Sequence, residues 1–454
     1  MKVLCDTKFM EKTVISTVPK SVVTGLLIVP LVLMSLGDLR NEVTPLGYWV
    51  LWGIWAVATT VVLSPWRSHI VRQQPPLLIL LSFGVLISGM VLSGLVNHDT
   101  ASIYQAVKIS VICGLFLVMW LMAVRLSPPQ VLVAMYLAVA VSVLCFFVLA
   151  LFGGHLENIE GRQGSIFAWF GSMWKAGAFF LPVFIADLIV RPKAWAINSF
   201  AIAACLFLVL LDGSRTGLLL IIAVLGASGV MLWWRRDLGP VLRRPKWVLL
   251  AACCLGGLFL INAAIKTQTS SRSVIVVAGV AKATEPVAPA PTPPPELGST
   301  LGKFENVAES ALAPLVKTRL GSGDDARVTL LRNGFMKVAA CLPLGCGFGS
   351  TASEISTGAS LYVHNAYLAA SADFGMLGLI GMLGFLLCSI LPLRLMLDRS
   401  APSTQAYYVG GLAGSGLAYS ATLALHTFTS EMSEWGYLVF ALAFAWSFFR
   451  RCDG

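Results

Sequence analysis

The stretch PPLLILLSFGVLISGMVLSGL, from Pro75 to Leu95, contains no charged residue and decides the class of fold. A helix that crosses a membrane needs about 20 mainly apolar residues, and this stretch has that length. Eleven further stretches of similar character occur approximately at Ser21–Gly37, Gly47–Ser64, Tyr104–Val124, Val131–Gly153, Ser165–Val190, Trp195–Leu211, Gly217–Trp234, Trp247–Ala263, Met376–Leu397, Ala406–His426 and Trp435–Phe449. The sequence therefore predicts an all-α polytopic membrane protein with about twelve transmembrane helices.

The composition excludes a single soluble core. Of the 454 residues, 57% are hydrophobic and only 12% are charged, which lies outside the range of soluble globular proteins. The net charge of +10 has a topological explanation, because cytoplasmic loops of membrane proteins retain Lys and Arg and attract anionic lipid. We expect contacts with membrane lipids and none with nucleic acid.

The distribution of Lys and Arg predicts the orientation in the membrane. More than half of the 32 Lys and Arg lie in the N-terminal segment, in the even-numbered loops and in the C-terminal tail. The short odd-numbered loops contain three, namely Arg40, Arg162 and Arg215. Both termini are therefore expected in the cytoplasm, and the long polar segment before His364 is expected to face outward.

This reading divides the chain into three parts. Residues 1–263 form transmembrane helices 1–9, residues 264–364 form an outward domain, and residues 365–454 form helices 10–12. Within the outward domain, the proline-rich stretch from Val287 to Pro295 favours an extended spacer. Apolar residues recur between Leu301 and Leu320 at the spacing of an amphipathic helix that lies on the membrane surface.

A second outward helix is expected to begin after Gly323, where Asp324 or Asp325 can cap it. Pro343 and Gly345 end it. Its apolar face consists of Val328, Leu331, Phe335 and Met336.

Two cysteines, Cys341 and Cys346, fall in the outward segment. Thiols in an oxidising compartment can pair. Both residues flank an apolar Pro-Leu-Gly turn, however, and free buried cysteine is common, so free thiols are the favoured interpretation. No Cys/His spacing indicates a metal site.

Charged residues at or near membrane depth are candidates for function, because each is costly unless it faces water or a partner. Arg215 lies in Asp212-Gly-Ser-Arg-Thr-Gly217, where it either binds a substrate or pairs with Asp212 at the interface. Arg162 precedes the sixth span. Lys175, further along that span, either lines a polar cavity or pairs with a carboxylate for packing.

Arg327 and His364 complete the set of candidates. The guanidinium fork of arginine suits pyrophosphate, because it donates two parallel hydrogen bonds and keeps its charge. Histidine suits general-base chemistry, because its ordinary pKa lies near neutrality. His364 is distinguished from the other histidines of the outer face by its place between Tyr362 and Asn365, where a span begins. We count both neighbours as candidate substrate-binding residues.

Several motifs follow one another in this part of the chain. Arg327 is followed by Pro343-Leu-Gly-Cys-Gly-Phe-Gly349, by His364-Asn-Ala-Tyr-Leu368 and by Phe374-Gly-Met-Leu-Gly378. This order resembles that of the O-antigen ligase and polymerase superfamily. Ser-Arg-Thr-Gly at Ser214–Gly217 is similar to the second arginine motif of that superfamily, and the resemblance covers about Arg162 to Gly378.

The resemblance implies a GT-C-like membrane glycosyltransferase with an undecaprenyl-pyrophosphate-linked glycan as donor. In the ligase, the acceptor is a sugar hydroxyl of lipid A-core, and transfer completes lipopolysaccharide on the periplasmic side of the bacterial inner membrane without a metal or other cofactor. Carried onto this chain, Arg215 and Arg327 hold the pyrophosphate and His364 assists the acceptor hydroxyl. The outward loops contain no Asp-x-Asp pair for a divalent ion, which agrees with the use of arginines.

Three alternatives stay open at this point. An O-antigen or exopolysaccharide polymerase uses the same donor with a lipid-linked acceptor, and a protein O-glycosylating enzyme uses a protein acceptor. One long outward domain and a conspicuous histidine favour the ligase. A transporter, with Lys175 and Asp187 as ligands, is disfavoured because the two halves show no repeat symmetry.

Overall fold

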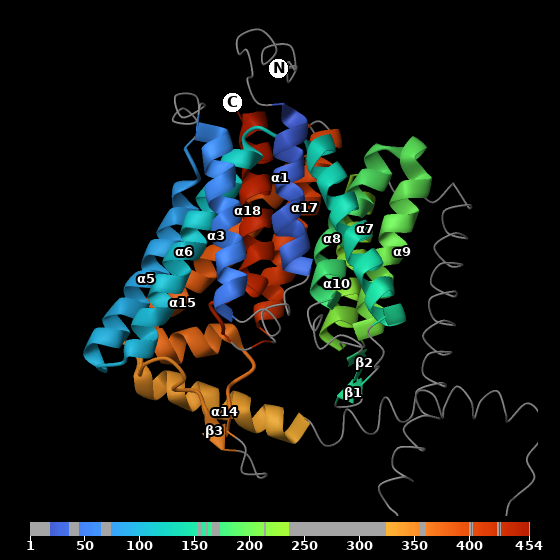
Figure 1. Cartoon of the computed structure of the whole chain (residues 1–454). Coiled ribbons are helices and arrows are strands. Elements are labelled where there is room, and N and C mark those ends of the chain that lie inside the picture. Colours follow the sequence, from blue (N-terminus) through green and yellow to red (C-terminus); the bar gives the residue numbers. More distant parts are fainter. Residues whose placement is uncertain are drawn as a thin grey trace, which may run out of the picture.

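The computed structural model describes residues 19–35, 45–64, 74–152, 157–159, 162–165, 173–212, 215–235, 324–354, 360–398, 401, 403–424, 426 and 428–453. In these residues the protein is a bundle of long helices (Figure 1). Each predicted span that falls on them coincides with a helix. The span Trp247–Ala263, the spacer Val287–Pro295 and the helix expected at Leu301–Leu320 lie outside the described residues.

The long helices are α1 (Lys20–Ser35), α3 (Pro45–Leu63), α5 (Leu77–Val96), α6 (Thr100–Ala123), α7 (Pro128–Phe152), α8 (Met173–Val190), α9 (Trp195–Asp212), α10 (Arg215–Trp234), α14 (Asp324–Cys341), α15 (Ala366–Ile390), α17 (Ser403–Leu423) and α18 (Met432–Asp453). Shorter helical elements are η3 (Pro192–Ala194), η5 (Leu391–Leu393) and α16 (Arg394–Leu397). Two small antiparallel hairpins pair β1 (Glu157–Ile159) with β2 (Arg162–Ser165), and β3 (Ser353–Glu354) with β4 (Ser360–Leu361).

Among the described residues, 5 helices are long and apolar enough to cross a membrane. They are Leu46–Leu63, Leu77–Val96, Thr100–Ala123, Pro192–Val209 and Ala366–Leu397. Shorter apolar helices lie at Lys20–Ser35, Pro128–Leu144 and Leu219–Trp234. The protein is thus a helical membrane protein, while twelve spans and a GT-C-like arrangement stay predictions.

The two ends of the bundle differ in charge. We call one of them the basic end, because arginines lie at or just beyond its helix ends: Arg191, Arg235, Arg394, Arg450 and Arg451. The first turn of α1 and the last turn of α18 both lie there (Figure 1). α14 lies across the opposite end, which we call the α14 end (Figure 1).

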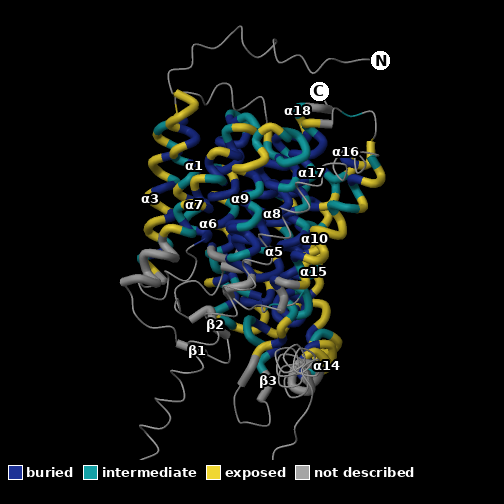
Figure 2. The backbone as a smooth tube through the Cα atoms, turned by 90° about the vertical axis from the view of Figure 1, so that its right-hand side faces the viewer, coloured by how far each residue is buried: buried dark blue, intermediate teal, exposed yellow. Residues whose placement is uncertain are grey.

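Glycines bring the central helices into close contact. A methyl group added at Gly89 of α5 would lie 2.9 Å from the backbone nitrogen of Gly378 in α15, and one added at Gly381 would lie 2.8 Å from the backbone nitrogen of Leu86. Small residues let helices approach closely where lipid gives no hydrophobic driving force for their association. Buried residues occur along the length of the bundle, whereas much of α14 is exposed (Figure 2).

Two helices differ from their expected bounds. α8 begins at Met173, eight residues later than the predicted span at Ser165, because Arg162–Ser165 form strand β2 instead. α15 begins at Ala366, well before the predicted Met376, and Gly375 at φ 71° interrupts it. Its first part, Ala366–Phe374, lies across the α14 end, and the part that begins at Met376 enters the bundle (Figure 1).

Candidate functional site

The sequence-predicted site residues all lie on elements at the α14 end. Arg162 is in β2, Lys175 is in the first turn of α8, Arg215 begins α10, and Arg327 is in the first turn of α14. Tyr362, His364 and Asn365 directly precede α15. For Arg162, Arg215 and Arg327 the structure describes the position of the backbone and not that of the side chain.

Tyr362 and His364 are exposed, and Val363 between them is 1% exposed. Val363 packs under α14, since a methyl group added at Gly334 would lie 2.9 Å from its Cγ2. In an extended segment, successive side chains point to opposite sides. Tyr362 and His364 therefore lie outside the contact that buries Val363 against α14.

Asn365 is the N-cap of α15. Its side-chain oxygen accepts hydrogen bonds from the backbone N–H groups of Tyr367 (3.1 Å) and Leu368 (3.0 Å). Such a cap satisfies donors that the helix itself leaves without partners. The cap fixes the direction in which the chain leaves His364, so this oxygen has a structural role whatever else Asn365 binds.

The motif from Pro343 to Gly349 forms a loop, here called the glycine loop, that fits into the kink of α15. Gly345 has φ 84°, and a methyl group there would lie 2.4 Å from the carbonyl oxygen of Asp373. A methyl group at Gly375 would lie 2.1 Å from the carbonyl oxygen of Pro343. Neither position has room for a side chain, and a positive φ is strained for every residue except glycine. These glycines are therefore required for the fold.

The backbone N–H groups of the glycine loop already have acceptors from the protein. Phe348 N–H donates to Asp99 Oδ2 (2.7 Å), and the N–H groups of Gly349 and Ser350 donate to the Asp373 carboxylate (3.1 and 3.0 Å). Gly347 N–H donates to the Ser93 hydroxyl at 3.2 Å. Successive N–H groups in such loops commonly bind phosphate. Here two carboxylates and a hydroxyl occupy the N–H groups that a phosphate would need.

Asp99 was not among the sequence-predicted residues, although it precedes α6 as a helix cap. Burial opposes its ionisation, but hydrogen bonds from the Ser102 hydroxyl and from the N–H groups of Phe348, Ala101 and Ser102 together hold its pKa below the usual range. Asp-x-x-Ser before an apolar stretch was the available signal. That signal predicts the cap and not the contact with Phe348.

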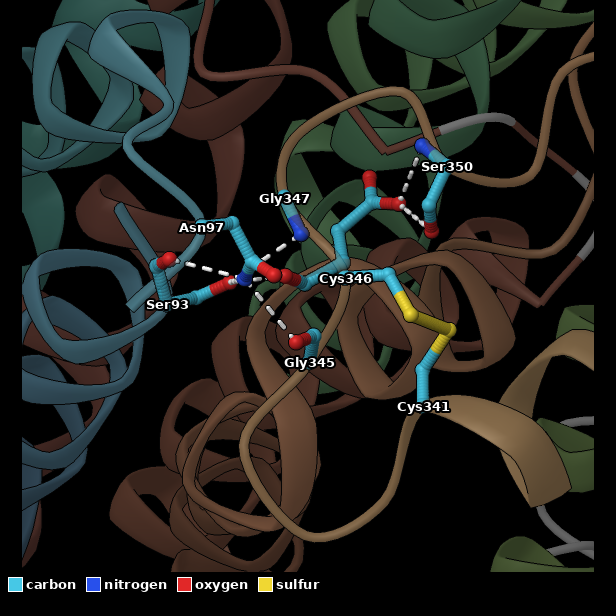
Figure 3. The surroundings of a disulfide bond; sticks show 8 residues. Ser93, Asn97, Cys341, Gly345, Cys346, Gly347 and Ser350 are labelled. Carbon is cyan, nitrogen blue, oxygen red and sulfur yellow. Dashed lines mark hydrogen bonds between the residues drawn. A yellow bond between two sulfur atoms is a disulfide. The ribbon is translucent and has the colours of Figure 1, made fainter. Parts of the chain in front are cut away.

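Cys341 and Cys346 form a disulfide. The interpretation of these residues as free thiols was wrong. Proximity in sequence does not decide pairing, but the cysteines lie on either side of the tight turn Leu342–Gly345, which brings them together. The bond joins the end of α14 to the glycine loop, beside Ser93 and Asn97 of the α5–α6 corner (Figure 3).

The neighbouring α5–α6 corner completes the attachment of the glycine loop. Asn97 donates a hydrogen bond to the carbonyl oxygen of Gly345 at 3.0 Å, and the Ser93 hydroxyl donates to the carbonyl oxygen of Asp373 at 2.6 Å (Figure 3). The loop is thus tied to α5, α6, α14 and α15 at once. It holds the segment that carries His364 in a defined place at the α14 end.

Lys175 and Asp187, the residues that a transporter would use as ligands, differ in their surroundings. Lys175 is buried at the α14 end, with 7% exposure. Asp187 is fully buried near the basic end, where it is paired with Arg191 at 2.6 Å and accepts hydrogen bonds from the hydroxyls of Tyr136 and Tyr408, both at 2.7 Å. Three partners satisfy this carboxylate, so Asp187 is explained as a packing contact between α7, α8 and α17.

The comparison with known families now bears on this geometry. The family model described as O-Antigen ligase matches residues 200–383, a range that contains α10, α14, the glycine loop, His364 and the kink of α15. Residues 200–383 are thus similar to the O-antigen ligase family. The O-antigen ligase family is one of glycosyltransferase-like membrane enzymes, and its matched range includes Arg215, Arg327 and His364. No curated protein matches the chain.

Within the described residues, no group of three or more His, Cys, Asp or Glu side chains is arranged to hold a metal ion. Independence of metals stays a prediction of the sequence. The chemical groups available at this end of the bundle are the exposed imidazole of His364 and the exposed phenol of Tyr362, together with the arginines carried by β2, α10 and α14.

Proposed function

We propose that the protein is an O-antigen ligase. It transfers a glycan from undecaprenyl pyrophosphate to a sugar hydroxyl of lipid A-core, and the α14 end faces the periplasm of a bacterium whose inner membrane the protein spans. The observation that carries this proposal is the match of residues 200–383, which places the family segment on the elements that hold His364. The arginine-rich opposite end supports the orientation, because cytoplasmic loops retain positive charge.

The proposed reaction has one displacement step. The acceptor hydroxyl attacks the anomeric carbon of the donor, the bond from that carbon to the pyrophosphate oxygen breaks, and undecaprenyl pyrophosphate leaves. His364 takes the proton of the attacking hydroxyl. A base in reach contributes typically about 10²–10⁴ in rate.

Arginines stabilise the leaving group. Arg215 and Arg327 hold the pyrophosphate, whose charge grows as the glycosidic bond breaks. Arg162 and Lys175 add positive charge at the same end, and Tyr362 and Asn365 flank the base. The glycine loop does not bind the pyrophosphate, because its N–H groups are occupied by Asp99, Asp373 and Ser93.

The decisive experiment uses the purified full-length protein in lipid nanodiscs. Lipid-linked glycan and lipid A-core are added, and the products are separated by size. We expect the glycan on lipid A-core, with activity retained in EDTA. Extension of the lipid-linked glycan without lipid A-core indicates the polymerase instead, and absence of both products rejects the glycosyltransferase assignment.

The arginine roles are tested by Arg215→Lys and Arg327→Lys. Each keeps the charge but loses the fork that makes two parallel hydrogen bonds. Removal of such a contact from a desolvated site costs about 2–5 kcal/mol, so each variant should lose most of its transfer rate. Arg450→Lys, at the basic end, is the control with unchanged activity. Transfer near the wild-type rate in both lysine variants shows that these arginines do not bind the donor.

A further inference from the structure

A stripe of polar residues winds around the first part of α6, each residue adjacent to the next. Asp99, Ser102, Gln105 and Lys108 recur every three residues, so their side chains lie near one another on the helix surface. Asp99 and Ser102 both accept the N–H of Phe348 in the glycine loop, at 2.7 and 2.9 Å. The half of the stripe at the α14 end, Asp99 and Ser102, therefore binds the glycine loop.

The other half of the stripe holds the connection between α17 and α18. The hydroxyl of Ser430 donates to Gln105 Oε1, and Lys108 forms an ion pair with Glu431. The side chains of this pair are only 14% and 18% exposed. The ammonium group of Lys108 also lies over the ring of Tyr104, 5.1 Å from its centroid.

Both halves of the stripe converge on Phe374. Phe348 of the glycine loop stacks on one side of Phe374, with ring centroids 6.3 Å apart and planes inclined by 11°. Phe428, three residues before Glu431, packs edge-on against it at 5.4 Å. Phe374 is thus held between two rings whose backbone segments are both bound to α6.

Phe374 is the last residue before the kink of α15, and the helical segment Ala366–Phe374 begins directly after His364 and Asn365. The other end of this segment is tied to α17, since the Tyr367 hydroxyl donates to the carbonyl oxygen of Ser420 at 2.9 Å. A rigid helical segment held at both ends fixes the start of the segment as well. The contacts of α6 therefore determine where His364 lies.

A gain in folding stability does not by itself explain why an ion pair, and not a pair of apolar residues, occupies positions 108 and 431. Two charges removed from water lose hydration that their mutual attraction restores only in part, and apolar residues of similar size often stabilise as well or better. An ion pair differs from apolar contacts in that it defines one geometry. This difference points to a positional role.

We propose that Lys108 and Glu431 are positioning residues of the transfer reaction. Through Phe428 and Phe374 they set the place of His364 relative to a membrane-embedded donor and its acceptor hydroxyl. This proposal rests on the proposed function of the α14 end. It assigns no contact with the substrate to either residue.

The first measurement separates rate from binding. Lys108→Met and Glu431→Gln each remove one charge, and the exchanged pair Lys108→Glu with Glu431→Lys restores the attraction in reverse. Lys193→Met removes an exposed lysine from the basic end and is the matched control. We expect kcat to fall about tenfold or more in each single variant while KM for the lipid-linked donor changes less than about threefold, and we expect the exchanged pair to recover most of the rate.

Each other pattern contradicts the proposal. An increase of KM with unchanged kcat shows that the pair binds donor directly. A loss that the exchanged pair does not recover shows that the two residues act independently. If the charge-removing variants fail to elute as monodisperse protein, Lys108→Arg and Glu431→Asp carry the same measurement, because they keep both charges and alter only the reach of the pair.

The second measurement does not depend on transfer. Hydrogen–deuterium exchange of the peptide containing Ala366–Phe374 is compared between the wild-type protein, Glu431→Gln and Lys193→Met. We expect faster exchange only in Glu431→Gln, because the segment loses one of its anchors. Unchanged exchange in that variant overturns the proposal. Should the wild-type protein show no transfer at all, the proposed function fails, and the exchange measurement still decides whether the pair positions this segment.

Discussion

Arg235 and Arg451 donate hydrogen bonds to backbone carbonyls at the ends of neighbouring elements. Arg451 of α18 reaches the carbonyl oxygens of Ala123, which ends α6, and of Leu126 beyond it. Arg235 reaches those of Met396 in α16 and of Asp398 after it. Helix ends leave carbonyls without partners inside the helix. Asp99 does the equivalent for N–H groups at the α14 end. At the scale of residues, these charged side chains supply hydrogen-bond partners to backbone groups at helix ends.

Asp99→Asn should lower the unfolding temperature at pH 7. The amide offers one acceptor oxygen in place of two and points a donor toward the N–H groups of Phe348 and Ser102. The pKa of Asp99 is lowered in the folded protein, so its stabilisation is present above the unfolded pKa of about 3.9 and is lost as the pH falls through the folded pKa. The difference in unfolding temperature between wild type and variant should therefore shrink below about pH 4. A difference that persists there shows that ionisation of Asp99 is not the cause.

His364→Ala should insert and fold normally, bind donor and transfer it slowly. The expected loss in kcat is about 10²–10⁴, the contribution of a positioned general base. Donor binding and the single-turnover rate are measured on the same preparation. A variant that binds donor poorly but turns over bound donor at the normal rate makes His364 a binding residue, and the base is then sought at His98, His155 or His426.

At the scale of elements, the glycines of α15 determine how closely it approaches α5. Gly378, Gly381 and Gly384 lie at intervals of three residues and face Gly89, Leu86 and Ser82 of α5. Part of the glycine string that resembles a family motif is therefore a helix-packing surface. The sequence of a motif does not show whether its residues serve the function or the packing of helices.

Gly381→Ala should destabilise the protein, because the new methyl group would lie 2.8 Å from the backbone nitrogen of Leu86, which cannot move independently of α5. Overpacking of this kind costs about 1–3 kcal/mol. Gly84→Ala is the matched control, since its methyl group would meet nothing within 4 Å. Unfolding temperature in detergent is measured for both. Equal temperatures for the two variants contradict a close contact between α5 and α15.

The sequence predicted the elements of the bundle well, because a helix that crosses a membrane must be apolar over a fixed length. It also predicted the bounds of α14, where Asp324 begins the helix and Pro343 and Gly345 follow its end. The sequence did not predict which face of α14 is buried. Leu331, Phe335 and Met336 are exposed, whereas Leu330 and Gly334 are buried. Gly334 lies on the packed face yet carries no hydrophobic side chain that would reveal it.

Contacts between distant segments were not predictable from one sequence. Asp99 and Phe348 are 249 positions apart, and nothing in either residue indicates the other. The disulfide was missed for a related reason, because its formation depends on the course of the turn between the cysteines. His364 was chosen as a candidate from its neighbours in the chain, which needs no tertiary information, and its role stays a prediction.

At the scale of the whole molecule, the two ends carry different chemistry. The basic end concentrates arginines, and the α14 end carries the disulfide together with His364. Disulfides persist in oxidising compartments and are rare in the cytoplasm. Both observations support the proposed orientation, in which the α14 end lies on the outward side.

Labelling of intact spheroplasts tests this orientation. After treatment with an impermeant reductant, an impermeant maleimide should label the wild-type protein and not the variant in which Cys341 and Cys346 are both serine. A cysteine introduced at Lys193, at the basic end, should react only after the membrane is permeabilised. Labelling of the Lys193→Cys variant in intact spheroplasts, with none at the native pair, reverses the proposed topology.

The pair between Lys108 and Glu431 also has a consequence for biosynthesis. The two residues are 323 positions apart, so α6 is synthesised long before the segment that carries Glu431. During most of translation Lys108 is present at membrane depth without this partner, where a charge is costly. We therefore expect α6 to rely on the insertion machinery, or on another polar surface, until the segment that carries Glu431 has been synthesised. Chains that stop before Glu431 lack the carboxylate that pairs with Lys108.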